Sequence, residues 1–184
     1  SYIVDYCIQF SLSNPHVSFV LLSDGQEKLN TTGITDLFQL MILFYGKSLK
    51  DSCVPVNETI GPITFTGYIS DPTLTFSNRT KQLITVNGRI IKNSLIMKAI
   101  TDSFRDLIPQ RRFPLVILHI TITQSLVDVN IHPQKADIKF VNPGFLFDCI
   151  PKVIMMSLQS SNQHTNPIEP IIREPQSSHG HEKK

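Results

Sequence analysis

The segment FPLVILHITIT, residues 113–123, constrains the fold of this 184-residue chain more than any other. It is rich in β-branched residues, and its apolar side chains do not alternate with polar ones. A continuous apolar run of this length is typical of a strand buried on both faces. The sequence therefore predicts a sheet strand that other parts of the chain cover on both sides.

Helices are predicted at both ends of the chain and between its strands. The first segment reads as the end of a helix that begins before Ser1, because its apolar residues fall on one face. Thr35 or Asp36 is expected to cap the second helix, and Gly46 to end it. The third is amphipathic and ends before Pro109. The predicted helices cover residues 2–12, 37–46, 94–108 and roughly 144–159.

Strands are predicted between these helices. Asp24-Gly25 lies between two strand-like runs and predicts a hairpin turn. Asn87-Gly88 interrupts an apolar strand and predicts either a bulge or a second hairpin turn. The predicted strands lie within residues 16–22, 28–32, 54–70, 82–92, 113–123, 125–132 and 136–141. This order indicates an α/β (α+β) domain with one mixed sheet and helices packed on one side.

The composition changes near Gln159. The remaining sequence is polar, rich in proline and free of aromatic residues, which is typical of disorder. We expect a folded domain over residues 1–160 and a disordered linker or tail over residues 161–184. Histidines in the tail lack the cysteine or carboxylate spacing of a metal site, so no metal site is predicted.

The spacing of the cysteines and the hydropathy of the chain indicate the cellular compartment in which the protein is expected. The three cysteines stand far apart and form no CxxC pair, which argues against a disulfide scaffold or a structural zinc site. No apolar run approaches the roughly 18 residues that a membrane span requires. These features predict a cytoplasmic protein without a membrane partner.

Charge is distributed unevenly along the chain. The formal net charge is +2, but residues 79–139 hold ten Lys or Arg residues against four Asp residues, which leaves a charge of −4 for the remainder. A basic block of this kind is found on surfaces that bind phosphates or nucleic acid. It is also found on ordinary solvated helix faces and strand edges, and charge alone leaves both interpretations open.

Sequence motifs of self-contained enzymes are absent. There is no GxSxG elbow, no GxxxxGK[ST] phosphate loop and no HExxH helix. Cys149 lies in an apolar segment and is expected to be a small buried hydrophobe rather than a nucleophile. His119 lies within the buried strand and is expected to be a core histidine. The chain is therefore not expected to be active alone.

The segment VDVNIHPQKADIKF, residues 127–140, is not explained by packing alone. Pro133 ends a predicted strand and fixes a turn that projects Lys135 from the end of the sheet. A lysine in that position suits a terminal phosphate, although an ordinary surface lysine would fit the pattern as well. Alternation places three polar residues on one strand face, namely Asp128, Asn130 and His132.

This segment, forty residues after Asn87-Gly88-Arg89, closely resembles the MutL family of DNA mismatch-repair ATPases. In that family the run reads VDVNVHPxKxEVRF and follows an FVNGR strand. The resemblance covers roughly residues 1–160. It implies a transducer domain with the fold of the second domain of ribosomal protein S-five. In the family this domain follows a nucleotide-binding domain of the gyrase, heat-shock-chaperone, histidine-kinase and MutL type.

The resemblance also implies roles for individual residues. Lys135 would be the catalytic and ATP-binding lysine that reaches the γ-phosphate of ATP, which the absent domain would bind with Mg. Arg89, Lys92 and Lys98 would contribute to the DNA-binding surface of a dimer. The residues expected to order the loops are Asn87, Gly88, Asp128, Asn130, His132 and Pro133.

The partners implied by the resemblance are DNA, a MutL-type nucleotide-binding domain, a homo- or heterodimer partner and a mismatch-sensing MutS-type protein. Two other functions remain open from the residues. The chain could be a stand-alone nucleic-acid-binding module of the same fold. It could also be the transducer domain of a type II topoisomerase or a heat-shock chaperone, although those relatives lack the VDVNIHP run.

Overall fold

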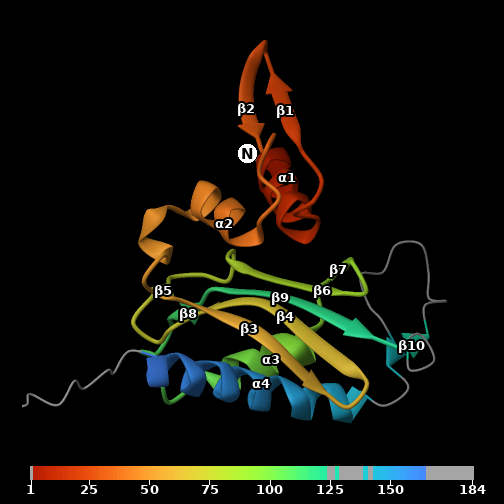
Figure 1. Cartoon of the computed structure of the whole chain (residues 1–184), viewed down its shortest axis with the longest axis vertical. Helices are drawn as coiled ribbons and strands as arrows, with labels where there is room; N and C mark the ends of the chain where they lie inside the picture. The colour runs from red at the N-terminus through yellow and green to blue at the C-terminus, as the bar shows by residue number, and fades with distance from the viewer. Residues whose placement is uncertain (1, 124–126, 129–138, 141–142, 165–184) are drawn as a thin grey trace, which may run out of the picture.

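The computed structural model describes residues 2–123, 127–128, 139–140 and 143–164 (Figure 1). Its helices are α1 (Tyr2–Ser13), α2 (Leu37–Tyr45), α3 (Ser94–Ser103) and α4 (Pro143–His164), with a short 3-10 turn at Lys47–Leu49. Its strands are β1 (Val20–Ser23), β2 (Gln26–Asn30), β3 (Cys53–Ile60), β4 (Ile63–Ser70), β5 (Thr75–Phe76), β6 (Gln82–Val86), β7 (Arg89–Ile91), β8 (Phe113–Pro114), β9 (Val116–Ile122), β10 (Val127–Asp128) and β11 (Lys139–Phe140).

A five-stranded mixed sheet forms the centre of the molecule, in the order β3-β4-β9-β6-β7. The apolar strand β9 lies in the middle, antiparallel to β4 and parallel to β6. Its side chains Ile117 and Leu118 point to opposite faces, and both are buried. The prediction of a strand covered on both faces is therefore confirmed.

Helices α3 and α4 pack side by side against one face of this sheet (Figure 1). Ile96 and Ile100 of α3 and Ile150 and Val153 of α4 are fully buried there. This arrangement confirms the predicted fold class, a mixed sheet with helices packed on one side, which α3 and α4 cover; α1 and α2 add partial cover on the other face.

The opposite face of the sheet is covered over part of its length by α1 and α2 (Figure 1). Leu12 of α1 and Leu40 of α2 are buried against Ile117 of β9. The ring of Phe38 stacks on that of Tyr68 in β4, with centroids 5.0 Å apart. Strands β1 and β2 form a separate two-stranded sheet that projects away from the centre.

Several boundaries differ from the predictions for local reasons. Asp36, rather than Thr35, caps α2, because its Oδ1 accepts a hydrogen bond of 2.8 Å from the Gln39 amide. Helix α3 ends at Ser103, several residues before Pro109. The hydroxyl of Ser103 donates to the Ala99 carbonyl, and such bonds weaken the last turn of a helix. Helix α4 runs on to His164, so the start of the predicted tail is helical.

The predicted domain limits and the disorder of the tail stay predictions, since residues 165–184 lie outside the described part of the chain. The structure describes parts of the two strands that were predicted on either side of the HPQK segment. These parts are β10 and β11, and they pair antiparallel. None of the helices it describes is both long and apolar enough to span a membrane.

Candidate functional site

The Asn87-Gly88 turn joins β6 to β7 as a two-residue hairpin, with Val86 paired to Arg89. Asn87 and Gly88 both have positive φ angles, +47° and +79°. Two consecutive positive φ values are required by a type I′ turn, for which Asn-Gly is the preferred pair. Of the two predicted alternatives, the structure therefore shows the hairpin turn rather than the bulge.

The Asn87 side chain joins this turn to the end of β9. Its Nδ2 donates a hydrogen bond to the Ile122 carbonyl at 3.0 Å, and its Oδ1 accepts one from the Ile122 amide at 2.9 Å. The Asn87 amide also donates to the Ile120 carbonyl at 2.9 Å. The side chain thus extends the parallel β6–β9 ladder beyond the end of β6. It ties the last residue of β9 to the β6–β7 turn.

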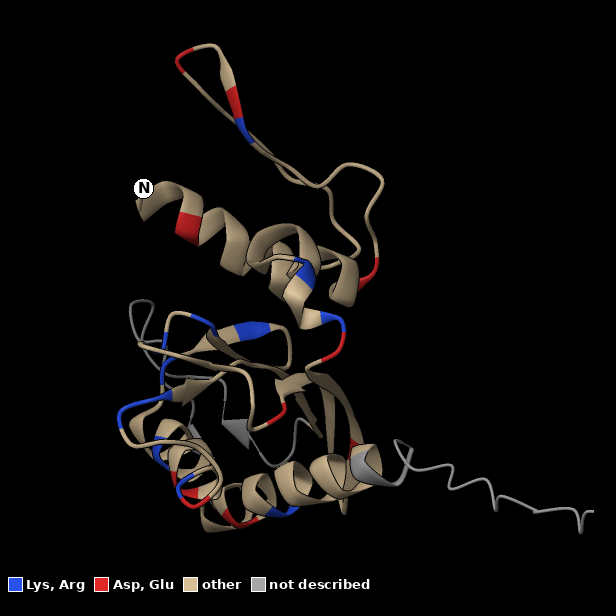
Figure 2. Ribbon diagram, turned by 90° about the vertical axis from the view of Figure 1, so that its left-hand side faces the viewer, with Lys and Arg blue, Asp and Glu red and all other residues tan. Residues whose placement is uncertain are grey.

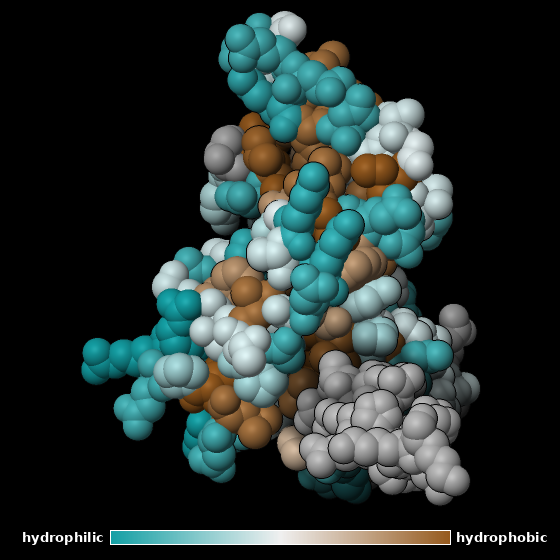
Figure 3. All heavy atoms as spheres, turned by 60° about the vertical axis from the view of Figure 1, so that its left-hand side comes forward, coloured by the Kyte–Doolittle hydropathy of each residue, from teal (hydrophilic) through white to brown (hydrophobic). Residues whose placement is uncertain are grey.

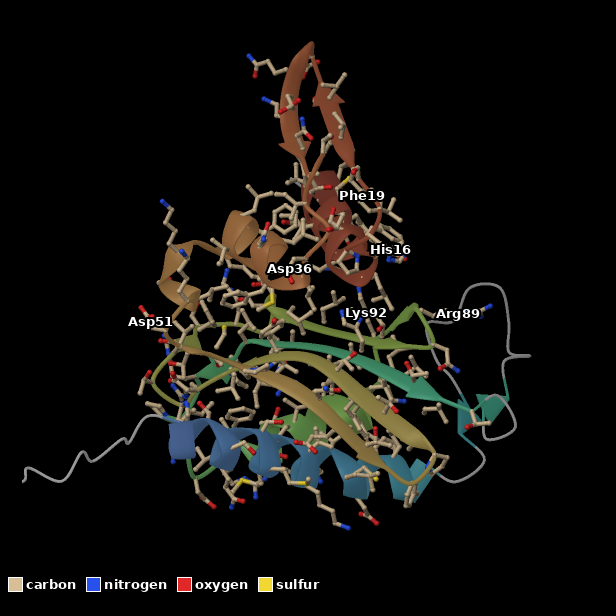
Figure 4. All side chains as sticks on the ribbon, in the orientation of Figure 1. His16, Phe19, Asp36, Asp51, Arg89 and Lys92 are labelled. Atoms are coloured by element: carbon tan, nitrogen blue, oxygen red, sulfur yellow. The ribbon has the colours of Figure 1, made fainter. Side chains whose placement is uncertain are left out.

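A groove lies between α1 and the β6–β7 hairpin. It consists of three adjoining hollows of about 530, 450 and 430 Å³ that share Gln9 and Lys92. Arg89 lines one of these hollows, and both it and Lys92 are exposed. Figure 4 shows Arg89 on β7 and Lys92 directly after that strand, below α1. Lys98 is exposed on α3 but does not line the groove, so the structure joins only two of the three predicted DNA-binding residues.

The described lining of the groove is more basic than acidic. Figure 2 shows Lys and Arg positions in blue on the strands below α1. The lining includes Arg79, Lys81, Arg89 and Lys92, whereas Asp5 is its acidic residue. The electrostatic potential of such a wall favours anionic ligands. All four cations belong to the basic block of residues 79–139, whereas nothing in the sequence indicates that α1 forms the opposite wall.

Two of these cations also contact aromatic rings. The Lys81 ammonium lies 4.2 Å from the ring centroid of Tyr45 and 4.9 Å from that of Phe76. Partial burial lowers the pKa of Lys81. The Arg79 guanidinium lies 4.9 Å from the Phe113 ring centroid. These contacts hold both side chains against the protein, so Arg89 and Lys92 are better placed to meet a ligand.

His119 lies in the central strand β9 and is half-buried, rather than part of the buried core as its position in the apolar run predicted. Its Nδ1 shares a hydrogen bond of 2.8 Å with the Thr85 hydroxyl on the neighbouring strand, and its buried Nε2 has no hydrogen-bond partner. Burial lowers the pKa of His119, because it disfavours the imidazolium. Burial also raises the pKa of Cys149, in keeping with its predicted place in the core.

His119 should make the stability of the protein depend on pH. The unfolded state has an ordinary histidine pKa of about 6.5, so below that pH it binds the proton more readily than the folded state does. We expect the free energy of unfolding to fall by up to about 1.4 kcal/mol per pH unit below pH 6.5 until the lowered pKa is passed. Urea unfolding at a series of pH values should show this slope.

The variant His119→Leu provides the control for that experiment. The other histidines contribute equally to both proteins, so the difference between the two curves isolates His119. Parallel curves for the wild type and the variant would contradict the prediction.

The remaining predicted site residues cannot be placed in the same way. Lys135, Asn130, His132 and Pro133 lie outside the described residues, and Asp128 is described only as part of β10. Their predicted roles, and those of Arg89, Lys92, Lys98, Asn87 and Gly88 toward ATP or DNA, stay predictions.

Comparison with known proteins identifies the family. Residues 41–159 match the family model described as the DNA mismatch repair protein, C-terminal domain. The DNA mismatch repair proteins MutL of Streptococcus uberis and Streptococcus sanguinis are each 34% identical over 173 residues. The chain belongs to the MutL family. The match covers 94% of this MutL chain but only 26% and 27% of those relatives, so the chain spans about a quarter of their length.

Solved structures show the same fold as this MutL-family chain. A crystal structure of the N-terminal domain of a DNA repair protein matches 88% of this chain and 54% of its own, with a TM-score of 0.71 and 18% identity. A variant of the Aquifex aeolicus MutL ATPase domain matches 82% and 49%, with a TM-score of 0.53 and 14% identity. The family match and the 34% identical relatives confirm the predicted resemblance to MutL, and the solved structures share its fold.

Proposed function

We propose that this chain is the transducer domain of a MutL-like mismatch-repair ATPase and that it completes an ATP site built mainly by a nucleotide-binding domain. The observation that carries the proposal is the family match over residues 41–159, which includes the HPQK segment and its Lys135. The similarity to an ATPase domain in a relative supports a nucleotide as the ligand.

In this proposal Lys135 acts through its charge. An ammonium on a long side chain can meet the γ-phosphate and stabilise the charge that develops on the transferred phosphoryl group. This role is electrostatic, and Lys135 is not proposed to act as a base. The bonds of Asn87 to Ile122 would help to define the path of the chain toward that lysine.

Magnesium is assigned to the neighbouring domain and the ATP bound there. Within the described ranges no three His, Cys, Asp or Glu side chains are grouped so as to hold a metal ion. The chain's own contribution to hydrolysis is proposed to be positioning and electrostatic stabilisation, through Lys135.

Substitution of Lys135 tests the ATP proposal. The nucleotide-binding domain of Streptococcus sanguinis MutL would be mixed with this chain, and phosphate release would be measured. We expect the wild-type chain to raise turnover. With Lys135→Ala that increase should be at least about a hundredfold smaller, since removal of one transition-state donor costs about 10²–10³ in turnover. Lys152→Ala, on the exposed face of α4, serves as the control. Equal stimulation by Lys135→Ala would contradict the proposal.

The basic wall of the groove is proposed to bind the DNA backbone. Since contacts to phosphates release counterions, log Kd should depend steeply on log salt concentration and little on sequence. Arg89→Ala combined with Lys92→Ala should reduce that slope by about 2, because each lost phosphate contact accounts for roughly 0.9. Fluorescence anisotropy with a labelled duplex measures both quantities.

Two further lysine variants define the limits of the proposed DNA-binding surface. Lys98→Ala tests whether α3, which lies outside the groove, belongs to the same surface. Lys28→Ala, on the projecting hairpin, should leave the salt slope unchanged. DNA binding that is unaffected by ATP and Lys135 would favour the alternative of a stand-alone nucleic-acid-binding module. A dimer partner and a MutS-type protein remain proposed partners.

A further inference from the structure

The four-residue turn over residues 109–112 holds an arginine in a conformation that favours glycine. The Arg112 amide donates to the Pro109 carbonyl at 3.2 Å and closes the turn. Arg111 has a φ of +62°, whereas Gln110 before it has no positive φ. A positive φ at the third position alone is typical of a type II turn, which takes Gly or Asn there. An arginine in that position strains the backbone of the free protein.

No contact within the described part of the chain accounts for this strain. Arg111 is exposed, and its guanidinium has neither a hydrogen bond nor an ion pair with any described residue. The next residue, Arg112, is by contrast bonded to Thr75, since its Nε donates to the Thr75 hydroxyl at 3.0 Å and a second nitrogen donates to the Thr75 carbonyl. Backbone strain that packing does not explain tends to occur where a protein binds a ligand. The Arg111 side chain is therefore available to a ligand outside the chain.

Further cations lie beside the turn, along one side of α3. Lys98 and Thr101 are three residues apart and share one face of that helix. The Arg79 guanidinium donates to the Thr101 hydroxyl at 3.2 Å and lies over the ring of Phe113, which directly follows the turn. Arg79 thus joins this face of α3 to the turn that holds Arg111.

We call this basic surface the α3 flank. Arg105, which lies just beyond the end of α3, belongs to it and pairs with Asp102, while Asp106 is a second carboxylate nearby. The excess of cations gives the surface a potential that favours phosphates. Figure 3 shows hydrophilic side chains that project from the lower part of the molecule. The members of the α3 flank are all exposed, namely Arg79, Lys98, Arg105, Arg111 and Arg112.

The α3 flank adjoins the groove. The largest of the three hollows is lined by Arg79 and Lys92 and also by Met97, the residue before Lys98 on α3. From Lys98 to Arg105 the chain advances by seven residues, which corresponds to about 10 Å along a helix. One DNA strand places its phosphates about 3.4 Å apart along the duplex axis. The flank is therefore long enough to contact several successive phosphates.

We propose that the DNA backbone continues from the groove along the α3 flank and that Arg111 binds one of its phosphates. A guanidinium can donate two parallel hydrogen bonds to a phosphate, and such charge-assisted bonds are strong. The energy of this contact offsets the strain of the turn when DNA is bound. The inference rests on the proposed function, because it extends the path of the proposed DNA ligand beyond the groove.

The composition of the flank favours nucleic acid over a protein partner. Protein interfaces are depleted of charged residues at their centre. The members of the flank are all cations, and its surface continues a groove that is itself basic. Contacts to phosphates carry no sequence information. Binding along the flank is therefore expected to be independent of DNA sequence.

The variant Arg111→Gly separates the strain from the binding. Glycine accepts the φ of +62°, so the thermal midpoint should rise by about 1–4 °C. Duplex binding should nevertheless weaken at least about threefold at about 0.1 M salt, and the slope of log Kd against log salt concentration should fall by about 0.9, the value for one phosphate contact. Circular dichroism and fluorescence anisotropy of the 184-residue chain measure the two effects. Unchanged affinity and slope would overturn the proposal and favour an acidic protein segment as the ligand.

Three further variants complete the experiment. Arg111→Lys should keep the salt slope even where its affinity falls, because one charge still neutralises one phosphate. Arg111→Asn accepts the positive φ without a charge and should behave like Arg111→Gly. Lys152→Ala removes an exposed cation from α4, which contributes no member to the flank, and should change neither quantity. A slope that falls as far in Arg111→Lys as in Arg111→Gly would contradict a phosphate contact.

The two proposals fail in different ways. A salt slope that Arg89→Ala combined with Lys92→Ala lowers, but Arg111→Gly does not, would overturn the inference and leave the groove as the proposed DNA site. A slope that Arg111→Gly lowers, but the groove variant does not, would support the α3 flank and contradict the DNA-binding role proposed for the groove.

Discussion

Replacing Gly67 with alanine is expected to destabilise the protein by at least about 4 kcal/mol, in the range of the most damaging single substitutions. Gly67 lies in the middle of β4 with a φ of +133°, which side chains rarely tolerate. A Cβ atom there would lie 2.0 Å from the carbonyl oxygen of Ile117. That oxygen belongs to the backbone of the central strand β9, so it cannot move aside without breaking the sheet.

Denaturant unfolding would measure this effect, with Gly33→Ala as the matched control. Gly33 also has a positive φ, +80°, but an added Cβ would meet no atom within 4 Å. Its replacement should cost only the backbone strain of about 1–2 kcal/mol. Similar losses in the two variants would show that strain, rather than the close approach to β9, governs Gly67.

Replacing Asn87 with glycine is expected to lower the free energy of unfolding by about 3 kcal/mol. The substitution keeps a residue that accepts the φ of +47° but removes both side-chain hydrogen bonds to Ile122. Each bond contributes about 1 kcal/mol, and leaving the Ile122 amide and carbonyl without partners adds a desolvation cost.

Hydrogen exchange at the Ile122 amide gives a local measurement of the Asn87 effect. Its protection should fall in Asn87→Gly, while that of the Leu118 amide should follow global stability only. Asn78→Gly is the control, since the Asn78 side chain bonds only within its own exposed turn, to Thr80. An Ile122 amide that stays equally protected would contradict the proposed tie between turn and strand.

Local sequence signals predicted the elements and their types because those signals act over a few residues. The apolar run identified β9, Asn87-Gly88 identified the turn after β6, and the spacing of apolar residues identified α3. The strand order could not be predicted in this way, because it depends on pairings such as Leu83 with Ile117 between distant segments. Periodicity alone predicted only the fold class, and the family resemblance predicted the specific fold.

The candidate site was predicted only in part, because several of its contacts join residues that lie far apart in the sequence. The basic block contained all four cations of the groove, yet only the structure shows that Lys81 and Arg79 lie over aromatic rings. The contribution of α1 to the groove could not be predicted, because nothing near Gln9 in the sequence indicates that this residue lies close to β7. The carboxamide bonds of Asn87 likewise join residues 35 positions apart.

The position of β9 has a consequence for synthesis of the protein on the ribosome. The β3–β4 and β6–β7 hairpins can form as soon as they emerge, because each pairs neighbouring segments. The strand that joins them, β9, emerges last of the five and must enter between them. Until then one edge of β4 and one edge of β6 stay open, which is a state prone to aggregation. A nascent chain stalled before Val116 should therefore depend on chaperones, and release from them should coincide with the appearance of β9.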